Sequence, residues 1–178
     1  MRTDKTIKDI SIDIVSEQEI MKYNMKLAKQ MKLPFGTLSR VLSSIEGGHN
    51  NPWPIVGVTK KALERFKEFN FLSKTPKGIK LGINRCHLRD RVVTHKELIE
   101  GNLLDKENGE WFDYWREGDK TVLATSSENK KGYVIPEEDI LPIERTGKLF
   151  VASSFSWRHT KQEQEYLRNL YERVIKDR

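Results

Sequence analysis

The chain has 178 residues, 37% of them hydrophobic and 33% charged, a balance that excludes a disordered polymer and indicates a folded core beneath a densely charged surface. Its 32 Lys and Arg residues outnumber its 26 Asp and Glu residues, and the formal net charge of +6 favours a polyanionic partner such as nucleic acid. The single cysteine, Cys86, excludes a disulfide framework and a multi-cysteine zinc site, and the absence of a signal-peptide or transmembrane stretch leads us to expect a cytoplasmic protein with no membrane partner.

The N-terminal part of the chain predicts a strand and then a helix. Apolar and polar residues alternate over 7–15, which is typical of a short strand. Ser16 can cap the first turn of a helix, and Glu19 can reach back to the cap amide in a capping box. We expect this helix to run to about Met31.

The next segment, "LAKQMKLPFGTLSRVLSS" at 27–44, combines helical apolar spacing with an interruption at its centre. Pro34 and Gly36 would break one long helix, but a tight turn between two packed helices accommodates both. We therefore expect a second helix from Thr37 to about Ser44.

Helices and strands are then mixed along the rest of the chain. Apolar residues at helical spacing predict helices over 59–71, 95–101, 110–116 and from Thr160 onward. Capping boxes at Thr94 with Glu97, and at Thr125 with Glu128, predict the start of the 95–101 helix and a helical turn after 125. Strands are expected over 79–88, 120–125, 140–143 and 148–153.

These elements predict an α+β fold in two parts. An α-rich part with a helix-turn-helix occupies 1–75, and a mixed α/β part occupies 76–178 and closes on an amphipathic helix. The apolar stripe of that last helix either packs on the chain's own core or forms a homodimer interface through Leu167, Leu170, Tyr171 and Val174.

The segment 27–44 resembles the helix-turn-helix of the lactose-repressor family, in which an alanine, a turn and a Thr-Val-Ser-Arg-Val-Val type helix follow one another. The residues in register are Ala28, Leu33, Thr37, Leu38, Ser39, Arg40, Val41 and Leu42. The family's turn usually holds glycine where this chain has Lys32, and a capping serine is common where it has Pro34. No counterpart of the family's sugar-binding domain is present, so the resemblance concerns DNA binding alone.

The resemblance implies that the second helix enters the major groove of double-stranded DNA. Phe35, Gly36 and Arg40 would then face bases, and Thr37 and Ser39 would contact phosphates. A single short helix reads few base pairs, so a homodimer on paired half-sites is expected. The protein would then be a sequence-specific regulator, repressor-like and without a cofactor; a helical hairpin that belongs only to the core is the alternative.

A second pattern indicates a different activity. "DKTVLATSSENKKG" at 119–132 is similar to the second half of an HNH nuclease motif, and "NRCHLRDR" at 84–91 supplies a histidine. That resemblance implies His87 as the general base and a divalent metal such as Mg²⁺ held by Asp119 or Asn129. In either reading Arg85, Arg89 and Arg91 are candidate phosphate contacts. The alternative function is thus a metal-dependent DNA endonuclease.

Overall fold

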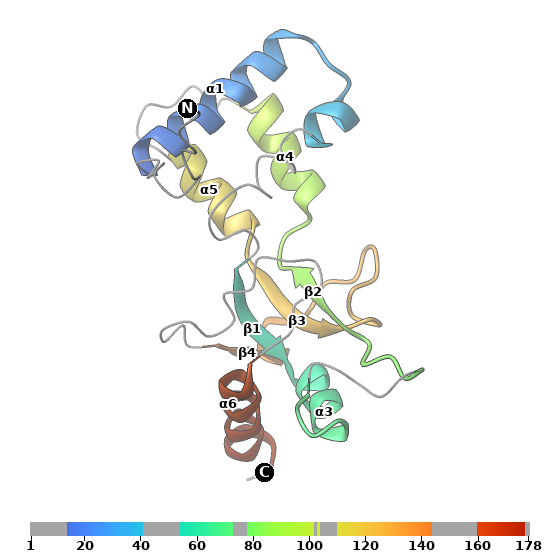
Figure 1. The fold of residues 1–178 in the computed structure, drawn as a ribbon. Coiled ribbons are helices and arrows are strands. Elements are labelled where there is room, and N and C mark those ends of the chain that lie inside the picture. The colour runs from blue at the N-terminus through green and yellow to red at the C-terminus, as the bar shows by residue number, and fades with distance from the viewer. Residues whose placement is uncertain are drawn as a thin grey trace, which may run out of the picture.

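A computed structural model describes residues 14–40, 54–72, 78–101, 103, 110–143 and 160–176 of the protein. A helical lobe lies at one end of the molecule, and a four-stranded mixed sheet with two further helices lies at the other (Figure 1). The α+β class expected from the sequence is confirmed. Within the described ranges, no helix combines the length and the apolar character needed to cross a membrane.

The sheet has the strand order β2-β3-β1-β4. Its two central strands, β3 (Thr121–Thr125) and β1 (Ile55–Thr59), run parallel to each other. The outer strands, β2 (Ile83–His87) and β4 (Ile140–Pro142), each pair antiparallel with their neighbour. The sequences TVLAT and IVGVT are apolar runs rich in β-branched residues, as expected for strands buried on both faces.

One face of the sheet is covered by α3 (Lys60–Glu68) and α6 (Lys161–Tyr171). Thr59 caps α3 by accepting a hydrogen bond from the Ala62 amide, and Thr160 opens α6 with a full capping box. The starts of both helices, near Thr59 and at Thr160, were predicted, whereas their caps were not. The helices bury one apolar cluster with the strands, which includes Ile55, Val58, Leu63, Phe66, Leu123, Leu167, Leu170 and Tyr171.

The position of α6 decides how its apolar stripe is used. Leu167 is fully buried, and Leu170 and Tyr171 are 4% and 8% exposed within the chain's own core. Of the two uses of this stripe that the sequence left open, these three residues pack on the chain's own core. A π-helical turn, Glu172–Lys176, follows α6, and a short 3₁₀ turn, Glu137–Asp139, precedes β4.

The helical lobe is built from α1 (Ile14–Gln30), a short helix at 35–40, α4 (Arg91–Glu100) and α5 (Glu110–Gly118). The chain enters α4 from β2 and leaves α5 into β3, so these two helices are inserted between adjacent strands (Figure 1). Their shared core contains Met21, Met25, Leu38, Leu98, Ile99, Trp111, Phe112 and Trp115.

Three helix starts differ from the expectation. α1 already includes Ile14 and therefore begins before Ser16. The short helix begins after Pro34, whose carbonyl accepts the Leu38 amide at 3.1 Å, rather than at Thr37. α4 is capped by Asp90, which accepts from the Val92 amide at 2.8 Å.

The predicted cap of α4, Thr94, lies instead inside that helix. It is 2% exposed, and its side chain packs where a Cβ on Gly118 would lie. The predicted division near residue 75 falls between β1 and β2, which belong to one sheet. The strand expected at 148–153, most of the strand at 7–15 and the helix beyond residue 40 lie outside the described residues.

Candidate nucleic-acid interface

A tight turn joins α1 to the helix at 35–40. Lys32 adopts a left-handed conformation with a φ of 50° at the position where the resembling family usually has glycine. Leu33, just after this turn, packs on the core of the lobe, and Leu38 on the second helix is 6% exposed in the same core. The two helices are thus held together across the turn by apolar burial on one side.

The side chains on the helix at 35–40 divide into an inner and an outer face. Phe35 is half-buried against the core of the lobe, and the Ser39 hydroxyl lies 2.8 Å from Nδ1 of the buried His95. These two residues therefore point inward, contrary to the expectation that they face DNA. Gly36, Thr37 and Arg40 are exposed on the outer face, as expected.

Positive charge is concentrated around this outer face. Residues 20–40 contain four lysines, one arginine and no acidic residue. Lys22, Lys26 and Lys29 follow one another at helical spacing along one side of α1, and Lys29 and Lys32 are exposed. This local excess of positive charge is visible in the sequence of 20–40, but it does not show in the net charge of the whole chain, which includes 26 acidic residues.

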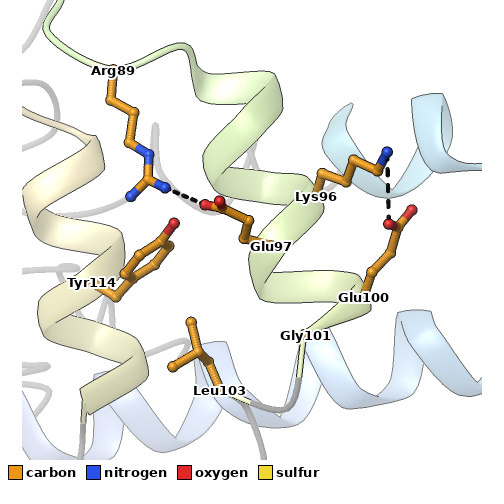
Figure 2. Close-up of a pocket in the computed structure, with 7 residues that line it drawn as sticks. All are labelled: Arg89, Lys96, Glu97, Glu100, Gly101, Leu103 and Tyr114. Carbon is orange, nitrogen blue, oxygen red and sulfur yellow. Dashed lines mark hydrogen bonds and ion pairs between the residues drawn. The ribbon is translucent and has the colours of Figure 1, made fainter.

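Arg89, a predicted phosphate contact, is engaged within the lobe. It forms an ion pair with Glu97, and its guanidinium lies over the Tyr114 ring at 4.5 Å from the centroid. Figure 2 shows this arrangement at the mouth of an open groove of about 560 Å³ between α4 and α5, lined also by Lys96, Glu100, Gly101 and Leu103. The Arg89 guanidinium is therefore engaged in contacts within the protein.

Arg85, His87 and Asp119 meet at the end of the sheet that faces the lobe. Arg85 is paired with Leu123 and His87 with Thr121 in the antiparallel β2–β3 ladder, and Asp119 lies two residues before Thr121. Burial lowers the pKa of the Arg85 guanidinium, while the charge of Asp119 acts in the opposite direction. The other predicted phosphate contact, Arg91, borders a narrow gap beside Asp119 and His95 that is too small to hold a water molecule.

Asn129 lies at the other end of β3. Its amide bonds to the carbonyl of Thr125, the last residue of that strand, whereas Asp119 precedes the first. A five-residue strand separates its ends by about 13 Å. Asp119 and Asn129 therefore cannot share one metal ion, and the HNH-type arrangement expected around His87 is not assembled.

The turn after β3 has a structural role that involves Glu128. This carboxylate is 2% exposed and accepts hydrogen bonds from the Thr59 hydroxyl at 2.9 Å and from the amide and hydroxyl of Thr125 at 2.8 and 2.7 Å. The predicted Thr125–Glu128 turn is confirmed. The bond to Thr59 was not predictable, because it joins the end of β1 to a turn 69 residues away in the chain.

No family model, curated protein or solved structure matches the chain in comparisons with known proteins. Among the residues that the structure describes, no three His, Cys, Asp or Glu side chains lie together as a metal site would require. The geometry of the lobe and the sheet is therefore the basis of the functional proposals.

Proposed function

We propose that the protein binds double-stranded DNA through the helix-turn-helix formed by α1 and the helix at 35–40, and acts as a sequence-specific, repressor-like regulator. The observation that carries this proposal is the left-handed turn at Lys32. It packs the second helix across the first through Leu38 and leaves Gly36, Thr37 and Arg40 exposed. A helix presented in this way fits the major groove.

The exposed side chains have different roles in the proposal. Arg40 is the base-reading residue, because a guanidinium can donate two hydrogen bonds to one guanine. Thr37, Lys29 and Lys32 contact phosphates, which fix the register of the helix without reading sequence. Gly36 permits close approach of the backbone to the groove.

The experiment is a selection of preferred duplexes from a random pool, followed by affinity measurements with Arg40→Ala. A bidentate arginine contact contributes about 1–3 kcal/mol of discrimination, so we expect cognate DNA to lose roughly 5- to 150-fold in affinity and random DNA much less. Arg173→Ala, an exposed arginine beyond α6, is the matched control. Equal losses on both DNAs would reduce Arg40 to a phosphate contact.

The proposed assembly on DNA is a homodimer on paired half-sites, about 34–36 Å or one helical turn apart. A single recognition helix spans too few base pairs for a unique site. Sedimentation of the protein with a selected duplex is expected to show two copies per site. A strict monomer, both free and bound, would remove the dimer from the proposal.

A metal-dependent DNA endonuclease is the second proposal, and the meeting of Arg85, His87 and Asp119 at one end of the sheet favours it. In this reading His87 removes a proton from the attacking water, and an added divalent metal stabilises the leaving oxygen. Cleavage of supercoiled plasmid with Mg²⁺ or Mn²⁺, lost in His87→Ala, would support it. Asn129 is remote from His87, so Asp119 is the candidate metal ligand, and a plasmid that stays intact with both metals would contradict the proposal.

A further inference from the structure

The Arg85 side chain is buried at its charged end without a hydrogen-bond partner. Its Nε, Nη1 and Nη2 atoms are each covered from solvent, and none of them has a partner. Buried polar atoms in native proteins are almost always hydrogen-bonded, and a guanidinium carries five N–H donors. The buried guanidinium of Arg85 therefore lacks hydrogen-bond acceptors, and a bound ligand with acceptor oxygens would supply them.

The protein itself offers this guanidinium only a neighbouring charge. Asp119, 4% exposed, acts on Arg85 electrostatically, but none of the residues that the structure describes forms a hydrogen bond or ion pair with the Arg85 guanidinium. The effect of burial is larger than the effect of the Asp119 charge, so the pKa of the Arg85 guanidinium is lowered. The site thus lacks an anion close enough to accept from the fork of Arg85.

Arg89 shows how the same fold satisfies an arginine when it has a structural role. Its guanidinium pairs with Glu97 and stacks on Tyr114 (Figure 2). Arg85, four residues earlier, has neither kind of partner among the described residues, although it lies on the face of the sheet that carries the main core. The contrast indicates that Arg89 has a structural role and that Arg85 is available to bind a ligand.

The chemistry of the site selects the ligand. The planar fork of a guanidinium matches the oxygens of a phosphate and can donate to two of them at once. His87 lies two residues along β2 on the same face as Arg85 and can supply a further N–H. Because the three nitrogens are covered, the backbone of an intact duplex cannot reach them, and an anion that binds there must be small enough to enter between the side chains around Arg85.

We propose that Arg85, with His87 beside it and Asp119 orienting its guanidinium, forms a binding site for a phosphate monoester, either free or at the end of a nucleic-acid strand. The site lies on β2, whereas the helix at 35–40 belongs to the helical lobe. It requires neither duplex binding by that helix nor DNA cleavage, so each of the three can fail without the others.

The test is the thermal stability of the full chain in inorganic phosphate and in chloride at matched ionic strength and pH. A ligand that binds the folded state raises Tm with the logarithm of its concentration, by roughly 5–10 °C at about 100 times its Kd for a chain of this length. We expect this rise for wild type in phosphate and its loss in Arg85→Met, which keeps the apolar stem. Arg173→Met, with the same change of charge at an exposed position, should keep the full rise.

Arg85→Lys provides a second variant that keeps the positive charge. It loses the planar fork, so the phosphate concentration needed for the same rise in Tm should increase at least about tenfold. Equal Tm values of wild type in phosphate and chloride would overturn the proposal. An undiminished phosphate response in Arg85→Lys and Arg85→Met would also overturn it, because the anion would then bind elsewhere.

The source of the phosphate is resolved by competition between two short single-stranded oligonucleotides of one sequence, one with a 5′-phosphate and one with a 5′-hydroxyl. Tighter binding of the phosphorylated strand, lost in Arg85→Met, would assign the site to nucleic-acid ends. A response to inorganic phosphate combined with equal binding of the two strands would support the site and assign it to free phosphate or a small phosphorylated ligand.

Discussion

The hydroxyl of Ser39 lies 2.8 Å from Nδ1 of His95, a residue on α4 that is only 1% exposed. This bond links the helix at 35–40 to α4 across 56 residues of sequence. It adds a directional polar contact to the apolar packing of Leu38. The rotation of the helix about its own axis is thereby fixed, and with it the direction in which Arg40 is presented.

Ser39→Ala is expected to lower the free energy of unfolding by about 1–2 kcal/mol, because it removes a hydrogen-bond partner from a buried imidazole. Thr37→Ala, an exposed hydroxyl on the same helix, should leave stability within about 0.5 kcal/mol of wild type and weaken only DNA binding. Urea denaturation of both variants measures the difference. Equal stabilities would show that the Ser39–His95 contact does not hold the helix.

Gly118 and Gly36 are expected to respond oppositely to alanine. A Cβ at Gly118 would lie 2.5 Å from the Thr94 hydroxyl oxygen and 2.6 Å from its methyl carbon, so Gly118→Ala should separate α4 from α5 and destabilise the protein by about 1–3 kcal/mol. No atom lies within 4 Å of a Cβ at Gly36, so Gly36→Ala should stabilise by about 0.5–1 kcal/mol through helix propensity. A neutral Gly118→Ala would contradict the close α4–α5 contact.

Glu128→Gln tests the buried carboxylate at the end of β3. Glu128 accepts hydrogen bonds from Thr59 and Thr125, and hydrogen bonds to a charged acceptor each contribute about 1.5–3 kcal/mol. We expect a loss of about 2–3 kcal/mol in the free energy of unfolding, since the amide can replace only part of this acceptor capacity. Glu138→Gln, at an exposed position, should be nearly neutral in the same assay.

Cys86 gives a prediction for alkaline pH. Burial first, and the charge of Glu128 second, raise the pKa of the Cys86 thiol above its ordinary value of 9.0. The folded chain therefore retains the proton where the unfolded chain releases it, so this contribution to stability is present below pH 9.0 and is lost as the pH rises through the folded-state pKa. Cys86→Ala should remove this part of the alkaline decline in Tm, and an unchanged decline would contradict the shift.

Local signals predicted much of the fold because their causes are local. Thr59 and Thr160 cap the helices that follow them, and TVLAT forms a strand because its β-branched residues suit a buried pleated surface. At α4 the predicted cap, Thr94, packs against Gly118 inside the helix, and Asp90, which was not predicted, caps it.

The candidate sites depended on contacts that sequence spacing does not encode. The exposed face of the helix at 35–40 was predicted from its resemblance, but the inward turn of Ser39 depends on His95, which belongs to a distant helix. Arg85 and Asp119 were each singled out, yet their meeting requires that α4 and α5 be inserted between paired strands. Such long-range pairings arise from tertiary packing, which local propensity does not determine.

The most direct test of DNA binding is the affinity of the full chain for a duplex over a series of salt concentrations. Each phosphate neutralised by a lysine or arginine contributes about −0.9 to the slope of log K against log salt. If Lys29 and Lys32 both contact phosphates of the DNA backbone, the slope should be about −2 or steeper. Lys29→Ala should reduce the magnitude of the slope by about 1, and Lys161→Ala, a change at an exposed lysine on α6, should leave it unchanged. No binding at low salt, or an affinity that stays constant across the series, would contradict a DNA-binding role for the helix-turn-helix.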